Sequence, residues 1–445
     1  MRKFCFWALL VLLALALLCG GCTRHSHHAQ NTLEGEELTA RLLPNPPAGT
    51  QPEPVPETGE KMLVEPETAA KAETALADLA VRMLQQTVSQ PAAEAKQPDN
   101  LLLSPVSLVY ALGMTANGAE AETLAQLEKA LGLNCAELNS YLAGLMQTGT
   151  EDEVLHLANS IWFRADPEFA IEDSFLQVNK DCYNAQLYAV PFNAATLQQI
   201  NDWVKLNTKG MIPQILQQIP DDMVMCLINA LAFEAKWETP FKPQQIEDGF
   251  FTTADGQERK VQMMYGAEHS YLEDEQACGF IKYYEGQKYA FVALLPNTDV
   301  SLADYVAGLS GEKLLALLAN RRAVKVETAI PEFSCDYSLQ MNAMLQAFGV
   351  QNAFDPDLAD FSGIGNYAGY PLYISQVLQK CHIEVDAQGT KAAAATAVVM
   401  NATSAYMPPE EVKYVYLNRP FVYLLLDCER GNLPLFIGVV ADINE

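Results

Sequence analysis

The hydrophobic positions of this chain change their spacing along its length. Apolar side chains recur at helical intervals within Ala77–Leu84, Ala121–Leu131 and Leu197–Leu206. Later in the chain, short apolar runs of strand length dominate, namely 227–237, 289–295, 324–330, 421–426 and 435–440. Helices that come mainly early and strands that come mainly late predict an α+β fold with large, mostly antiparallel sheets.

Local signals place several element ends. Ser104-Pro105 follows the apolar run Leu101–Leu103, so Ser104 is expected to cap a helix whose first residue is Pro105. Asp255-Gly256 lies between two strand-like runs and predicts a β-hairpin. Glu429–Asn432 separates the last two apolar runs, which predicts a second and fully buried hairpin.

Composition narrows the class of protein. The chain has 445 residues and is 50% hydrophobic, enough for one large core or two modest ones. Its formal net charge is −27, whereas a nucleic-acid binder needs a basic surface, so we expect no nucleic-acid partner.

The N-terminus has the pattern of a targeting segment. Arg2 and Lys3 precede the apolar run 6–18, which is short for a membrane span and typical of a secretory signal. Small residues before Cys22 resemble the cleavage box of bacterial lipoproteins. The resemblance implies that 1–21 is a signal peptide and that Cys22 carries lipid, palmitate included, which anchors the chain to the bacterial envelope facing outward. Ordinary signal cleavage with a free Cys22 is the alternative.

Residues 22–72 are rich in proline and glutamate and contain little that would form a core. We expect them to be an extended tether, with His25, His27 and His28 as part of a polar spacer rather than a metal site. The globular domain is predicted over 73–445. Seven of the ten cysteines lie in it, scattered and without a CxxC pair, which argues against a disulfide framework or a zinc site.

Motifs of common enzymes are absent: the chain has no GxSxG, HExxH, P-loop or GxGxxG pattern. Cys381 and His382 are neighbours, but adjacent side chains of a strand point to opposite faces, which makes a poor catalytic pair. Asp355, Asp357 and Asp360 lack the glycine and distal glutamate of a calcium loop. We therefore predict no enzyme activity, no cofactor and no metal.

An unusual run of small side chains follows the strand-like segment Ile383–Asp386. It consists of Gly389, Thr390, Lys391, Ala392, Ala393, Ala394, Ala395 and Thr396, and we call it the hinge. In an extended chain Thr390 and Thr396 share one face and Lys391 lies on the other, toward water. Small residues on one face would let the hinge enter between two strands without a clash. An ordinary alanine-rich helix or linker is the alternative.

Several segments together resemble the serpin family over roughly 73–445. They are Asn100–Ser107, Ala158–Trp162, Ile200–Val204, Leu227–Phe233 with Trp237 and Pro240-Phe241, Asp360–Ile364 and Asn418–Phe421, in the order that the family shows. The resemblance implies an inhibitor of serine proteases with an exposed reactive loop near the C-terminus. The protease cleaves the loop and is trapped as an acyl-enzyme while the hinge inserts into the main sheet.

The family's usual spacing from Gly389 places the reactive bond at Thr403-Ser404. Ala402-Thr403 and Asn401-Ala402 are neighbouring options, because the segment from Ser404 to Asn418 is longer than in many relatives. Small, uncharged residues there favour an elastase-like or subtilisin-like target protease and leave papain-like cysteine proteases open. We expect a monomer.

By the same resemblance, a sheet-opening cluster lies where the strands must part. It comprises Ser104, Ser107, Asn229, Gln379 and Trp237. Two departures stand out. Gln379 occupies a position where serpins often have histidine, and Ala387-Gln388 replaces two acidic residues before the hinge.

Two other functions remain open at this point. One is a non-inhibitory serpin that acts as a binding or chaperone-like module, although such members tend to carry charged or bulky hinge residues. The other is a solute-binding lipoprotein outside the family, which the tether and the anchor fit equally well.

Overall fold

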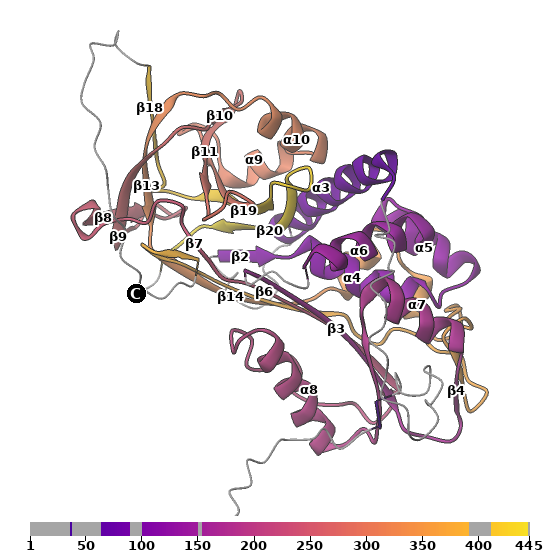
Figure 1. The fold of residues 1–445 in the computed structure, drawn as a ribbon. Coiled ribbons are helices and arrows are strands. Elements are labelled where there is room, and N and C mark those ends of the chain that lie inside the picture. The colour runs from indigo at the N-terminus through magenta and orange to yellow at the C-terminus, as the bar shows by residue number, and fades with distance from the viewer. Residues whose placement is uncertain (1–35, 38–63, 90–99, 150–153, 391–410, 444–445) are drawn as a thin grey trace, which may run out of the picture. The chain divides into compact units, whose positions relative to one another are not determined.

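The computed structural model describes residues 36–37, 64–89, 100–149, 154–390 and 411–443, all within the unit Gly35–Glu445 (Figure 1). Its helices are α3 (Pro66–Ser89), α4 (Pro105–Ala116), α5 (Ala121–Leu131), α6 (Cys135–Gly149), α7 (Asp173–Tyr183), α8 (Ala194–Asn207), α9 (Leu302–Gly308), α10 (Gly311–Ala319) and α11 (Asn342–Ala347), with 3-10 turns η1 (Pro243–Gln245) and η2 (Asn352–Phe354). None of the described helices is long and apolar enough to cross a membrane.

A six-stranded antiparallel sheet forms the centre of the core. Its order is β10 (Tyr271–Glu273), β11 (Ala277–Tyr283), β12 (Tyr289–Pro296), β19 (Phe421–Asp427), β20 (Leu433–Val440) and β2 (Asn100–Leu103). Every residue of β12, β19 and β20 is buried, which explains why these strands are continuous apolar runs rather than alternating ones. Helix α3 packs on β20 and α10.

A second sheet contains β18, the first strand after residues 391–410. Its order is β18 (Val412–Tyr416), β13 (Lys325–Pro331), β9 (Glu258–Glu268) and β8 (Ile246–Thr252), at the left of Figure 1. Strands β8 and β9 form the predicted hairpin, in which Gly256 has φ +80°, a conformation that favours glycine. Strand β18 runs parallel to β13 and is an edge of this sheet.

The main sheet consists of two hydrogen-bonded groups of strands. One has the order β1 (Glu36–Glu37), β5 (Gln186–Val190), β3 (Leu155–Arg164) and β6 (Met225–Phe233). The other has the order β14 (Phe333–Gln340), β16 (Leu378–Val385), β17 (Gly389–Thr390) and β7 (Ala235–Lys236). Only Glu234 separates β6 from β7, so the two groups continue one another. A small ribbon of β4 (Phe169–Ile171) and β15 (Gly365–Tyr367) lies apart from them.

Among the described residues, one strand position of the main sheet is occupied only at one end; we call it the unfilled strand position. Strand β17 lies between β16 and β7, and it ends at Thr390. Beyond that point no strand pairing joins β6 to β16 among the described residues. Both flanking strands run in the same direction, so a strand placed between them would be antiparallel to each, as β17 already is.

The predicted α+β fold is confirmed, with differences in detail. Helix α3 begins at Pro66, before the expected start of the domain at Glu73, and Ala72 is fully buried. Glu36–Glu37, inside the expected extended tether, pairs with β5 and forms the edge strand β1 of the main sheet. Helices α9, α10 and α11 interrupt the strand-rich second half. Their short apolar patterns were not recognised in the sequence.

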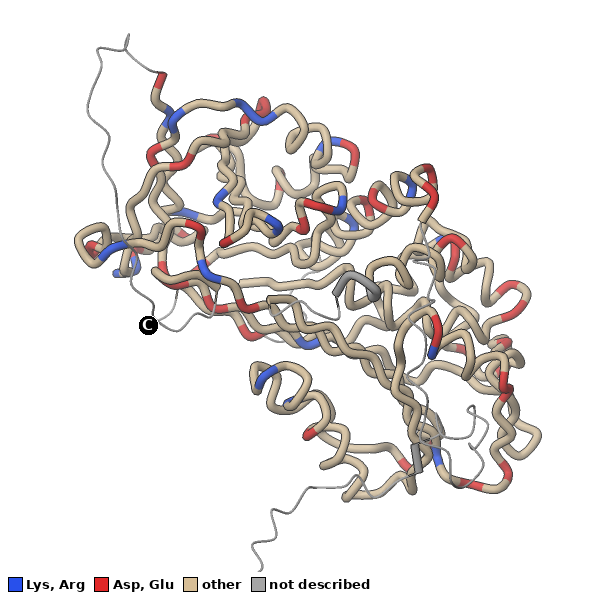
Figure 2. The backbone as a smooth tube through the Cα atoms, viewed as in Figure 1, with Lys and Arg blue, Asp and Glu red and all other residues tan. Residues whose placement is uncertain are grey.

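The two strands that border the unfilled strand position differ in their charged residues. Strand β6 contains no charged residue, whereas β16 carries Lys380 and Glu384, neither of which is buried. In Figure 2 most acidic and basic positions lie on helices and loops. Burial is the physical reason, because an unpaired charge at the interior of a sheet loses its hydration.

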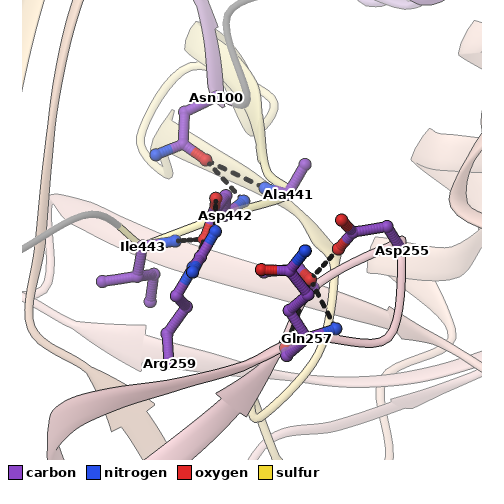
Figure 3. Close-up of polar contacts among 8 residues, drawn as sticks. Asn100, Asp255, Gln257, Arg259, Ala441, Asp442 and Ile443 are labelled. Atoms are coloured by element: carbon purple, nitrogen blue, oxygen red, sulfur yellow. Dashed lines mark hydrogen bonds and ion pairs between the residues drawn. The ribbon is translucent and has the colours of Figure 1, made fainter.

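Polar contacts tie the C-terminal segment to the start of β2 (Figure 3). The Oδ1 atom of Asn100 accepts hydrogen bonds from the amides of Ala441 at 2.9 Å and Asp442 at 3.2 Å. The Asp442 carboxylate in turn accepts from Arg259 Nε at 3.1 Å and from the amide of Ile443 at 2.7 Å. These bonds hold the chain in place after β20 ends at Val440.

We predict that Asn100→Ala lowers the free energy of unfolding by about 1–3 kcal/mol, because two amides lose their shared acceptor beside a buried carboxylate. The measurement is a guanidinium unfolding curve. Asn297→Ala is the control: it removes an exposed bond to the carbonyl of Glu275 and should change stability by less than about 0.5 kcal/mol. Equal losses in the two variants would contradict this account.

Candidate functional site

The first two hinge residues already lie inside the main sheet. Thr390 pairs with Val385 of β16 on one side and with Ala235 of β7 on the other, and Gly389 pairs with Lys236. The side chain of Thr390 is 1% exposed. The sequence predicted that Thr390 faces inward. Its seating in this structure, rather than in an exposed loop, was not predicted.

A buried hydroxyl pair fixes the side chain of Thr390. Its Oγ1 atom lies 2.6 Å from the Oη atom of Tyr284. The Tyr284 ring stacks on Trp237, with 4.4 Å between ring centroids and 13° between planes. Burial raises the pKa of Tyr284 well above its usual value, so this phenol stays protonated and able to hydrogen bond. Sequence reasoning missed Tyr284, since its contact to the hinge is formed only by the fold.

The turn before the hinge is held mainly through its backbone. The Oδ1 atom of Asp386 accepts from the amides of Gln388 at 2.7 Å and Gly389 at 3.0 Å, an arrangement in which the aspartate side chain stabilises its own turn. Trp237 donates its amide to the carbonyl of Gln388 and its indole Nε1 to the carbonyl of Asp386, both at 2.9 Å. The amide of Phe241 donates to the carbonyl of Ala387 at 2.8 Å. The Ala387 and Gln388 side chains therefore contribute little to this anchorage.

Glycine is required at position 389 for steric reasons. A Cβ atom placed on Gly389 would lie 2.0 Å from the carbonyl oxygen of Ala235 and 2.8 Å from the Cα of Lys236. Both contacts involve backbone, which cannot swing aside as a flexible side chain would. The close approach of β17 to β7 depends on this residue.

A buried lysine, Lys282, lies against the rings of Trp237 and Phe241. The Nζ atom of Lys282 is 4.5 Å from the Phe241 ring centroid and 5.2 Å from that of Trp237, and it pairs with Glu268 at 2.8 Å. Burial raises the pKa of the Glu268 carboxyl, although the Lys282 ammonium opposes this shift. The Lys282 ammonium thus makes cation–π contacts with two aromatic residues that bond to the turn before the hinge.

The other members of the sheet-opening cluster lie together below the seated hinge. Gln379 donates from Nε2 to the carbonyl of Ser104 at 2.8 Å and accepts from the Ser104 amide at 3.0 Å. The Ser104 hydroxyl donates to the carbonyl of Leu435 at 2.9 Å. It also accepts from the amide of Ser107, so the predicted helix cap of α4 is confirmed.

A chain of hydrogen bonds continues the cluster across β6 and β3. The Ser107 hydroxyl donates to Asn229 Oδ1. Asn229 donates to Asn159 Oδ1 at 2.7 Å, and Asn159 donates to the carbonyl of Tyr183 at 2.7 Å. Asn159 is almost fully buried and was missed as a member of the cluster. The sequence did offer a signal for Asn159, because it lies within a strand-like segment with apolar neighbours. A buried amide there needs hydrogen-bond partners and so indicates a polar cluster.

A cavity of about 370 Å³ lies next to the cluster, along the unfilled strand position. Its walls include Met225 and Leu227 of β6, residues of α4, and the segment 370–379 that leads into β16. Ser107, Asn229 and Gln379 form its polar part. Most of its lining is apolar.

Several predicted residues fall outside the described part of the chain: Lys391, Ala392, Ala393, Ala394, Ala395, Thr396, Thr403, Ser404 and Cys22. Within it, Cys381 is buried, whereas His382 on the next position pairs with Asp336 at 2.8 Å across β14, as opposite faces of a strand require. The described residues contain no group of His, Cys, Asp or Glu side chains suited to a metal ion.

Comparisons with known proteins agree on one family. The sequence profile described as Serpin (serine protease inhibitor) matches residues 74–443. The chain is 30% identical to the plasma serine protease inhibitor of Homo sapiens, over 78% of this chain and 86% of that protein. It is 28% identical to alpha-1-antitrypsin 1-5 of Mus musculus, over 83% and 88%. The crystal structure of a thermophilic serpin, tengpin, in the native state matches with a TM-score of 0.78 and 38% identity, over 92% of this chain and 100% of that one.

We predict that Gly389→Val expels β17 from the sheet, because a branched side chain cannot fit against the Ala235 carbonyl. The amides of Trp237 and Phe241 then lose their acceptors, and their hydrogen exchange should accelerate by at least about tenfold. Mass spectrometry of exchanged peptides measures this. Gln388→Ala, which keeps the backbone acceptor, is the control and should leave the exchange unchanged. Parental protection in Gly389→Val would show that the close approach is not needed.

Proposed function

The chain belongs to the serpin family, a family of serine protease inhibitors rather than enzymes, and from this premise we propose that it is an inhibitory member. The observation that carries the proposal is the seated start of the hinge: Gly389 and Thr390 lie between β16 and β7, and no other described strand continues this position between β16 and β6. The residues that follow in the sequence are small, with one charge at Lys391, which a continued strand would place on the opposite face from Thr390. A solute-binding lipoprotein outside the family is no longer a candidate.

The proposed reaction begins as proteolysis. The protease nucleophile attacks the carbonyl carbon of Thr403, the peptide bond to Ser404 breaks, and Ser404 leaves with the new amino terminus. The Thr403 carbonyl remains esterified to the enzyme. The hinge is then tethered only at Thr390, and its insertion carries the bound protease along the sheet before water can release it.

The register of β17 supports this path of insertion. Thr390 pairs with Val385 and with Ala235, and each residue further along moves one position down both flanking strands. Continued without a bulge, Thr396 pairs with Gln379 on one side and with Asn229 on the other. Both flanks, counted independently, lead to the sheet-opening cluster. The hydroxyl of Thr396 would then meet the amides that must change partners as the strands part.

The cavity supports the same register. Val398 would pair with Leu227 and Val377, and Met400 with Met225 and Ser375, all four of which line the cavity. In a continued strand, Val398 and Met400 would share the inward face of Thr390, because alternate residues lie on the same face. Two apolar side chains would therefore fill the space that the native sheet leaves open. Each such burial is worth about 1.5–3 kcal/mol.

Backbone hydrogen bonding supplies the larger driving force. A strand from Lys391 to about Ala402 would add bonds to β16 and to β6. At about 1 kcal/mol net for each bond, the gain is on the order of 10 kcal/mol. The native fold must be metastable by a similar amount, and the cleaved, inserted form must be the more stable one.

The reactive bond favours proteases with shallow apolar binding pockets. Thr403 is small and uncharged, so we propose an elastase-like or subtilisin-like partner, with papain-like cysteine proteases as a further class. The test is incubation with pancreatic elastase and with subtilisin, followed by denaturing electrophoresis and mass spectrometry of the released fragment. An adduct that survives denaturant supports inhibition. Cleavage to fragments alone, without a rise in melting temperature, supports the non-inhibitory alternative.

We predict that Thr390→Arg reduces the fraction of protease trapped by at least about tenfold, because a guanidinium cannot enter the buried site beside Tyr284 without a partner. Cleavage should continue, so the variant becomes a substrate. Lys391→Arg is the matched control. It places the same arginine side chain one position further on, where we expect it to face water, and this variant should trap protease as the parent does. Trapping by Thr390→Arg at the parental level would refute strand insertion as the working step.

We also propose that the folded domain, which includes helix α3 from Pro66 onward, is carried on the proline-rich segment that follows a lipidated Cys22 after removal of 1–21, on the outside of a bacterial cell. The small residues before Cys22 and the proline-rich tether support this. The test is expression in a bacterium with labelled palmitate. The parent and the control Cys135→Ser should carry label and sediment with membranes, and Cys22→Ser should do neither. Label on Cys22→Ser would refute the anchor.

A further inference from the structure

Three tyrosines are exposed together on the sheet formed by β18, β13, β9 and β8. Tyr414 and Tyr416 of β18 are 65% and 39% exposed, and Tyr265 of β9 is 37% exposed. The rings of Tyr265 and Tyr416 lie 6.1 Å apart, and those of Tyr414 and Tyr416 lie 6.2 Å apart, each pair at 77°. We call these three residues the aromatic face. Edge-to-face contacts hold the rings in one arrangement although they are open to solvent.

The strand between them explains how the rings meet. Ala329 of β13 pairs with Tyr265 on one side and with Tyr416 on the other. The side chains of Ala329, Tyr265 and Tyr416 therefore point to the same side of the sheet. Ala329 is fully buried although it lies on this outer side. Its small side chain lets the two rings approach over it. The aromatic face is thus a built feature of three neighbouring strands rather than scattered exposed residues.

Charges around the aromatic face are paired. Lys325 and Glu327 of β13 form an ion pair, and Glu411 accepts from Arg322 at 2.9 Å and from Lys413 at 3.4 Å. The chain as a whole carries a net charge of −27, so this balanced region is unlike the average surface. A partner that docks here has to match an apolar, planar surface with tyrosine hydroxyls, not a strong charge.

The chain length limits how far the aromatic face lies from a bound protease. Ten residues from Ser404 to Tyr414 span at most about 35 Å even when fully extended. A protease of about 220 residues has a radius of gyration of about 17 Å and measures about 45 Å across. An enzyme bound at the reactive bond is therefore wide enough to reach β18 and its neighbours.

We propose that the aromatic face is a second docking site for the target protease, which binds the rim of the enzyme outside its active-site cleft and raises the rate at which the loop is captured. This proposal rests on the proposed function, since it assumes the reactive bond at Thr403-Ser404. Tyrosine is enriched at protein interfaces, where it provides large contact area with little loss of side-chain freedom. The preferred partner surface is apolar with exposed backbone carbonyls that accept from the phenols.

The test compares the rate at which intact chain is consumed by pancreatic elastase or subtilisin, whichever cleaves the parent faster. Tyr265→Ala is the decisive variant, because it leaves the sequence near the reactive bond untouched. Tyr414→Ala/Tyr416→Ala removes the rest of the face. Phe250→Ala, an exposed aromatic residue on the opposite edge strand β8, is the matched control. Melting temperatures and the rate on a free peptide spanning 398–408 complete the set.

We expect the double variant to lower the second-order rate of consumption by about tenfold and Tyr265→Ala by about threefold, with Phe250→Ala and all melting temperatures unchanged. Rates within twofold of the parent in both tyrosine variants would overturn the proposal. So would size-exclusion data in which the parent is an oligomer and the variants are monomers, since the face would then join copies of this chain. Consumption is measured whether or not an adduct survives, so failure of trapping and failure of docking are separate results.

Discussion

The antiparallel pairing of Gly389–Thr390 between β16 and β7 is the constraint on which the rest of the site depends. It sets the direction and the register of any strand that follows, because each later residue must take the next position on both neighbours. Beyond Thr390, no other strand lies between β16 and β6 among the residues that the structure describes. Gly389 and Thr390 therefore already occupy the first two places of a possible further strand.

Anchorage of the hinge uses backbone groups where relatives often place acidic side chains. The carbonyls of Asp386, Ala387 and Gln388 receive donors from Trp237 and Phe241, and the Asp386 carboxylate closes the turn. Substitution of the two usual acids by Ala387-Gln388 is therefore compatible with a firmly held hinge. The buried Lys282–Glu268 ion pair adds an electrostatic contact to the aromatic rings, which otherwise interact with their neighbours mainly by packing.

The sheet-opening cluster shows how buried polar side chains are accommodated between the strands of the main sheet. Every amide that it uses has a partner in the native state: Gln379 binds both backbone groups of Ser104, and Asn229 links Ser107 to Asn159. Glutamine in place of the frequent histidine keeps one donor and one acceptor at this position and removes a group that titrates near neutral pH. On our proposal, the hydroxyl of Thr396 arrives where these partners are exchanged.

The sequence by itself determined the α+β class, the cap at Ser104, the hairpins, and the face on which Thr390 lies, because period, capping and turn chemistry are local properties. Only the tertiary structure decided that Gly389–Thr390 is already seated, that Tyr284 and Asn159 belong to the site, and that Tyr265 joins Tyr414 and Tyr416. Each of these facts depends on strands from distant parts of the chain becoming neighbours. No local pattern records such a pairing, because the contact energy exists only once the sheets have formed.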